Sequence, residues 1–160
     1  MEKLKVNDTP VRTARNFLIN NIEVELEIPE KIAEFRNVEI VSDGSIIDNK
    51  TTNQALTYGT GKILEELNYE TANNKIRIRT GNKKENIRIR YTFDDENINL
   101  INQIEIIANG DTNLIIEYIS NTSKKCLHNG IIRTIANAKS KLDITIVNLL
   151  NEQSENFEAI

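Results

Sequence analysis

The chain has 160 residues, with 20 Lys and Arg against 24 Asp and Glu, which gives a formal net charge of −4 and a pI of about 5.2. That length is enough for one domain with a hydrophobic core. A weakly acidic chain with 5% aromatic residues and no Trp lacks the positive field and the stacking surfaces of a general nucleic-acid-binding protein. We therefore expect no nucleic-acid partner.

Cysteine content and hydropathy indicate the compartment. One Cys cannot form an internal disulfide, and the first twenty residues lack the positively charged start and apolar run of a secretory signal. No stretch approaches the roughly 18 apolar residues of a membrane-spanning helix, and the mean hydropathy is −0.42. The sequence predicts a soluble, cytoplasmic protein with no membrane partner.

Residues 1–74 are expected to form an amino-terminal segment with strands and one short helix. A strand is predicted at residues 23–27, where Val and Leu alternate with Glu before a proline ends the run. A second strand is predicted at residues 38–41, followed by an Asp-Gly turn. The best helix candidate lies between residues 51 and 68, where a short apolar stripe accompanies two Glu residues and predicts one or two turns.

From about residue 75 onward, apolar and polar residues alternate, most plainly as Ile and Arg in residues 75–79 and 86–91. Alternation with period two is the signature of a strand with one buried face. Similar runs follow at residues 103–107, 114–119, 130–135 and 142–147. Turns are predicted between them at residues 109–111, 121–123, 128–130 and 137–139.

Evenly spaced strands rich in Ile favour a sandwich, a barrel or a solenoid, and periodicity alone does not separate these folds. Two segments end alike, as Ile107-Ala108-Asn109 and Ile135-Ala136-Asn137. Similar ends are typical of coils stacked along an axis. The pattern therefore leaves a β-solenoid and a β-sandwich open for residues 75–160, the predicted core.

Cys126 and His128 are the candidate cofactor-binding residues. On a strand, residues two apart share a face, so a thiolate and an imidazole could bind one metal or persulfide. The chain has no second Cys or His, and a tetrahedral site would need carboxylates or another subunit. The alternative is a small buried thiol beside a His that is hydrogen-bonded to turn backbone at residues 128–130.

Other motifs favour no enzyme. The turn at residues 59–62 (GTGK) fails the phosphate-loop pattern, because Leu56 and Ile63 occupy positions that require Gly and Ser or Thr. Acidic residues at 94–96 and at 23, 25 and 27 are interpreted as solvated, and no Gly-x-Ser-x-Gly elbow is present. Cross-strand ion pairs, or alternatively partner contacts, are predicted for Arg77, Arg79, Arg88 and Arg90, placed on the outer faces of two neighbouring strands.

Residues 85–96 (ENIRIRYTFDDE), 102–107 and 112–118 resemble the start of the core in the SufB/SufD family of iron–sulfur cluster assembly proteins. Residues 127–133 (LHNGIIR), 141–148 (KLDITIVN) and 156–157 (NF) resemble its "LHNAVVE … AKLKYTTVQN … NF" signature. Near the amino terminus, residues 10–13 (PVRT) and 17–20 (FLIN) are similar to its "PVRTW…LKVN" segment, with Ala14 in place of Trp.

The resemblance implies a right-handed parallel β-helix in which inward Ile, Val and Leu form an apolar column. It also implies a non-catalytic scaffold role: family members form a complex with the ATPase SufC, on which iron and sulfur are combined before transfer. No intrinsic cofactor is expected, only a transient iron–sulfur cluster in a larger complex. Family members are longer, and their proposed cluster-handling residues and SufC-binding region lie beyond the matched part, so no such role transfers to a residue here.

The expected partners are a SufC-like ATPase, a SufB/SufD-like subunit and a second copy of this chain. A last coil with unpaired backbone groups along residues 142–147 would invite edge pairing, and subunits of this family meet through their β-helices. The chain is then a fragment or a short paralogue. A structural or protein-binding β-solenoid without an iron–sulfur role is the alternative. A carbohydrate-active β-helix enzyme is disfavoured, because the sequence offers only scattered carboxylates.

Overall fold

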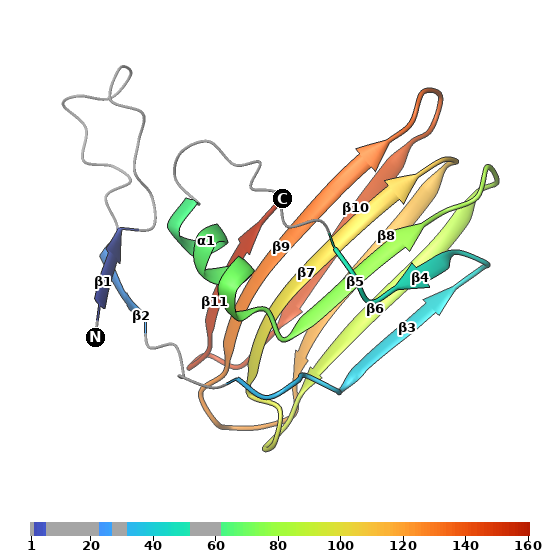
Figure 1. Cartoon of the computed structure of the whole chain (residues 1–160). Coiled ribbons are helices and arrows are strands. Elements are labelled where there is room, and N and C mark those ends of the chain that lie inside the picture. Colours follow the sequence, from blue (N-terminus) through green and yellow to red (C-terminus); the bar gives the residue numbers. More distant parts are fainter. Residues whose placement is uncertain (1, 6–22, 27–31, 52–61) are drawn as a thin grey trace.

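The computed structural model describes residues 2–5, 23–26, 32–51 and 62–160 (Figure 1). The strands in these ranges are β1 (Glu2–Lys5), β2 (Glu23–Leu26), β3 (Val38–Ser42), β4 (Ile46–Asp48), β5 (Asn74–Arg79), β6 (Glu85–Phe93), β7 (Asn99–Ala108), β8 (Thr112–Ser120), β9 (Leu127–Ala136), β10 (Leu142–Leu149) and β11 (Glu155–Ala159). The helix is α1 (Lys62–Thr71). β1 and β2 form an antiparallel pair.

From β5 onward, successive strands alternate between two sheets and form a parallel β-solenoid of about three turns (Figure 1). The four-stranded sheet has the order β10-β8-β6-β3, and the five-stranded sheet has the order β11-β9-β7-β5-β4. Strands β5 to β11 pair with one another in parallel within each sheet. The parallel β-helix prediction is therefore confirmed.

The register shows a regular coil length on one side of the solenoid. In the five-stranded sheet, partners such as Arg77 and Glu105, or His128 and Asn156, are 28 residues apart. In the four-stranded sheet the spacing is 27 residues from β6 to β8 and 30 from β8 to β10. Relative to the preceding coil, one additional residue lies in the corner at 121–126 and two lie in the corner at 137–141, where Lys139 has a positive φ of 71°.

The alternating Ile residues form the core between the two sheets. Ile76 pairs in register with Ile104, which pairs with Ile132, and all three are buried. The other sheet contributes its own buried residues at the same alternation, namely Ile87, Ile89, Tyr91, Phe93, Leu114, Ile116 and Tyr118. β-branched side chains fit such pleated, stacked surfaces.

Two antiparallel strands complete the amino-terminal end. β3 pairs with β6 and β4 pairs with β5, and the turn between β3 and β4 uses Gly44 at a φ of 138°, which favours glycine. The strand and turn predicted for residues 38–44 are confirmed. Phe35 lies over this end of the core, with its ring edge-on to Tyr91 at 6.0 Å and to Phe93 at 5.2 Å.

Helix α1 packs on the outer face of the five-stranded sheet, against β7 and β9 (Figure 1). It begins at Lys62 and ends at Thr71, so it contains the predicted apolar stripe and extends three residues beyond the predicted range. Buried Asn68 donates hydrogen bonds to the backbone carbonyls of Asn102 at 3.0 Å and Asn129 at 2.8 Å. The helix thereby tethers two adjacent coils.

Candidate functional site

The segment with Cys126 and His128 lies inside the solenoid. The turn predicted at residues 128–130 is wrong, because β9 runs continuously from Leu127 to Ala136. Both candidate side chains are fully buried, and the Cys126 thiol packs in the hydrophobic core with its Sγ 3.5 Å from the carbonyl oxygen of Lys124. The thiol is therefore enclosed by the core and is not presented at the surface.

His128 is hydrogen-bonded by asparagine side chains from the coils on either side, not by turn backbone. Its Nε2 lies 3.0 Å from Oδ1 of Asn102, and its Nδ1 lies 2.5 Å from the side chain of Asn156. Burial lowers the pKa of His128 to about 4, although the Asn156 contact acts in the opposite direction. The imidazole is therefore neutral at pH 7.

The neighbours of Asn102 define which nitrogen of His128 carries the proton. The Asn102 amide directs its NH₂ to the Tyr118 hydroxyl at 3.4 Å, so its oxygen faces His128. A neutral imidazole has one N–H, and we assign it to Nε2, which then donates to Asn102. Nδ1 is then an acceptor, whereas the structure places Oδ1 of Asn156 against it. A flip of the Asn156 amide, which exchanges its oxygen and its NH₂, would supply the donor that Nδ1 needs in this tautomer.

A carboxylate on the last strand continues this polar network. The Tyr118 hydroxyl donates to Oε1 of Glu158 at 2.7 Å, and the Tyr118 ring lies 3.9 Å from the His128 ring. Burial raises the pKa of Glu158 above its usual range, and it raises the pKa of Tyr118 well above that of a free phenol. Stacked on Tyr118, Tyr91 donates to Asn74 at 3.1 Å.

Gly130 provides the space for the histidine ring. A Cβ at this position would lie 2.8 Å from Nε2 of His128 and 3.0 Å from Oδ1 of Asn102. The glycine thus serves close packing within a strand, and this explains why turn chemistry alone misled the interpretation of residues 128–130.

The sequence interpretation missed Asn102, Tyr118 and Glu158. Asn102 pairs in register with Gly130, which pairs with Glu158, and these positions are far apart in the chain. The 28-residue spacing of the five-stranded sheet would have aligned Asn102, Gly130 and Glu158, but the strand runs alone do not display that spacing. Tyr118 lies on the four-stranded sheet and would not have been found in this way. Together with His128, the three missed residues form a group of polar side chains within an otherwise apolar core. We call this group the polar level.

This arrangement links buried side chains by hydrogen bonds and does not form a metal site. In the part of the chain that the structure describes, no three His, Cys, Asp or Glu side chains come together in a group that could hold a metal ion. Ligation by Cys126 and His128 stays a prediction. The GTGK turn and the segments at 10–13 and 17–20 lie outside the described residues, apart from Lys62, which begins α1.

Alternating charges run across the outer faces of both sheets. Arg77 Nε lies 2.6 Å from Glu105, Arg90 Nε lies 2.7 Å from Glu117, and Arg88 contacts Glu39 at 3.6 Å. The predicted cross-strand ion pairs are confirmed for these arginines. The expectation that the arginines lie on neighbouring strands is wrong, since β5 and β6 belong to different sheets.

The carboxyl-terminal end presents the edges of both sheets. β10 pairs only with β8, and β11 pairs only with β9, among the described strands. Inward residues Leu142, Ile144 and Ile146 on β10 are only partly buried, and Leu149 is 60% exposed. The expected open edge along residues 142–147 is therefore present.

Comparison of the chain with protein-family models, curated proteins and solved structures gives no match. Helix α1 is too short to cross a membrane, and the described residues contain no other helix of sufficient length and apolarity.

Proposed function

We propose that the chain is a SufB/SufD-like, non-catalytic scaffold subunit of iron–sulfur cluster assembly. One observation carries the proposal. Two of the three parts of the family-like signature lie side by side in register, with His128 opposite Asn156 and Asn129 opposite Phe157. These residues are distant in sequence, yet one of the pairs makes a direct side-chain contact, which supports treating the signature as a structural unit.

The buried thiol defines the kind of subunit. Iron–sulfur clusters are held mainly by cysteine thiolates, and Cys126 is enclosed in the core. We therefore assign the cluster ligands to a SufB/SufD-like partner, and to this chain the role of extending the β-helix platform on which a SufC-like ATPase acts. Any cluster is transient and belongs to the assembled complex.

The open edges of β10 and β11 suit this role. Unpaired strand edges are templates for pairing with another chain, and the inward apolar residues of β10 are incompletely covered. The proposal includes self-association through the same edges when the partner subunit is absent. Cytoplasmic location is part of the proposal as well.

The decisive experiment is anaerobic reconstitution with ferrous iron and sulfide, read by visible absorption and native mass spectrometry. The chain is tested alone and with a SufC-like ATPase and a SufB/SufD-like subunit, with Cys126→Ser in parallel. We expect a cluster only in the complex and no effect of the substitution. A cluster that disappears with Cys126→Ser would show that the thiol is a ligand, against the assignment above.

The interface is tested with two matched variants. Leu149 on β10 and Ile46 on β4 are both 60% exposed, at opposite ends of the solenoid. Lysine on an edge strand opposes strand addition, so Leu149→Lys should abolish assembly and Ile46→Lys should preserve it. Sedimentation over a dilution series measures the outcome, and a wild-type chain that stays monomeric and captures no partner subunit would overturn the proposal.

A structural or protein-binding β-solenoid without an iron–sulfur role is the second candidate. It is favoured by the buried thiol and by the lack of a metal-binding group in the described ranges. In the same experiment it predicts a stable folded chain that forms no cluster with any partner.

A further inference from the structure

A groove opens at the amino-terminal end of the solenoid, opposite the end used in the proposed assembly. It has a volume of about 440 Å³, within the range of ligand-binding pockets. We call it the amino-terminal groove; its lining residues come from residues 34–40, Asn49 and residues 72–76. The groove runs between the segment leading into β3 and the start of β5.

One wall of the groove contains an unpaired stretch of strand. β4 covers β5 only from Arg77 to Arg79. The preceding residues 74–76 pair with β7 on one side and with no strand on the other side among the described residues. A half-paired strand that borders a cavity is the geometry by which extended peptides add to a sheet.

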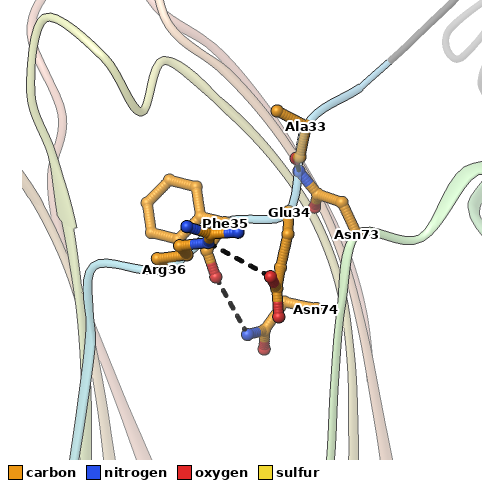
Figure 2. Close-up of polar contacts among 6 residues, drawn as sticks. All are labelled: Ala33, Glu34, Phe35, Arg36, Asn73 and Asn74. Carbon is orange, nitrogen blue, oxygen red and sulfur yellow. Dashed lines mark hydrogen bonds and ion pairs between the residues drawn. The ribbon is translucent and has the colours of Figure 1, made fainter.

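Side chains hold this wall in place. Asn73 donates to the carbonyls of Ala33 at 2.8 Å and Asn99 at 2.9 Å, and Asn74 donates to the carbonyl of Phe35 at 3.5 Å. Figure 2 shows Asn73 and Asn74 beside the segment that carries Ala33 and Phe35. Because both amides are already engaged, a ligand has the backbone edge as its main source of hydrogen bonds, and the wall is preorganised.

The groove has an apolar floor and a positive rim. Phe35 and Ile76 are each 2% exposed, and Ile40 beside them is partly buried. On the rim, Arg36 and Glu34 pair with each other at 3.2 Å, as Figure 2 shows. Lys75 has no such carboxylate partner in the described part of the chain, so the rim carries a net positive charge.

We propose that the amino-terminal groove binds an extended acidic peptide segment of a partner protein, which adds as a strand to residues 74–76 of β5. Alternate side chains of the peptide point in opposite directions. Apolar ones therefore enter the groove toward Ile76 and Ile40, while acidic ones remain at the rim near Lys75. This binding does not depend on the iron–sulfur role.

The test uses fluorescence anisotropy with a fluorescein-labelled peptide, acetyl-Glu-Ile-Glu-Val-Glu-amide, and the full chain. We expect saturable binding that Lys75→Glu weakens about tenfold. The matched control is Lys83→Glu, which makes the same charge change at an exposed turn outside the groove and should leave the affinity unchanged. The charge-reversed peptide acetyl-Lys-Ile-Lys-Val-Lys-amide should bind Lys75→Glu better than wild type, which also shows that the variant is folded.

A backbone-methylated form of the acidic peptide distinguishes strand addition from simple charge attraction. Methylation removes the N–H donors and keeps every side chain, so we expect binding to be lost. Three results would overturn the proposal: no binding by wild type, equal affinity of the methylated peptide, or equal weakening by Lys75→Glu and Lys83→Glu. Failure of cluster assembly would leave these expectations unchanged.

Discussion

At the scale of single residues, the polar level inside the solenoid is the feature that most constrains the sequence. Neutral His128, the amide of Asn102 and the hydroxyl of Tyr118 satisfy one another in a region from which water is largely excluded. Buried polar groups are costly unless they are paired, so each member depends on the geometry of the next. Small changes at this level should therefore have large effects.

Replacing Gly130 with Ala tests how tightly this level is packed. The added Cβ meets the imidazole and the Asn102 oxygen inside normal contact distance, and we expect a loss of about 1–3 kcal/mol in unfolding free energy. Gly81→Ala serves as the control, because its Cβ meets a single atom, Oε1 of Glu85, at 3.0 Å. Urea denaturation measures both, and equal losses would argue against tight packing around His128.

Protonation of His128 should make stability depend on pH. Its pKa is about 4 in the folded chain and 6.5 in the unfolded chain. Between these values the unfolded chain binds a proton that the folded chain does not, so the unfolding free energy falls as the pH is lowered through this window, by about 3 kcal/mol at most.

Two variants separate the pH effect of His128 from that of Glu158. The raised pKa of Glu158 has the opposite sign, since its burial costs stability as the pH rises above about 4.5. In denaturation series at several pH values, His128→Gln should reduce the fall toward pH 4, whereas Glu158→Gln should retain it. Identical profiles for wild type and His128→Gln would contradict the lowered pKa.

At the scale of elements, the ion pairs on the outer faces of the sheets show how burial affects the strength of an ion pair. The pair between Arg77 and Glu105 joins β5 to β7, with side chains only 22% and 5% exposed. The pair between Arg36 and Glu34 has side chains 82% and 70% exposed. Solvent screening weakens the second pair far more than the first.

A double-mutant cycle at each pair should show this difference. For Arg77→Ala and Glu105→Ala we expect a coupling energy of about 1 kcal/mol or more, and for Arg36→Ala and Glu34→Ala less than about 0.5 kcal/mol. Chemical denaturation of the single and double variants gives both values. A larger coupling at the exposed pair would contradict the role assigned to burial.

The strands could be predicted from sequence far better than their arrangement. Alternation of Ile with Arg identified β5 and β6, because one face of each is buried and the other carries charge. Nothing in that alternation shows where the chain turns into the other sheet, so the two strands were wrongly placed as neighbours. The contact between Tyr118 and Glu158 depends on coil register, which a period of two does not encode.

At the scale of the whole molecule, the two ends of the solenoid differ. Phe35 and two antiparallel strands cover the amino-terminal end, whereas the carboxyl-terminal coil has open edges and partly exposed apolar residues. Each coil of a solenoid contacts only its neighbours, so an end without a cover lacks half of its stabilising contacts. In the proposed assembly, the open carboxyl-terminal coil is the one that pairs with another chain.

Removal of the covering ring should weaken the entire solenoid. Phe35 is 2% exposed and contacts two aromatic rings of β6, so Phe35→Ala should cost about 3 kcal/mol or more in unfolding free energy. Val41→Ala on β3, where the side chain is 47% exposed, should cost much less. Thermal unfolding followed by circular dichroism compares the two, and similar melting temperatures would show that Phe35 contributes little to the end cover.

The unequal spacing of the two sheets has a consequence for how this chain can vary. The register spacing is three residues longer from β8 to β10 than from β6 to β8, whereas the spacing in the five-stranded sheet stays constant. A corner loop can therefore lengthen without disturbing the stack, whereas one residue inserted within β7 would turn its buried side chains outward. Longer loops for recognition can therefore be added at the corners, whereas the register between coils fixes the length of the strands.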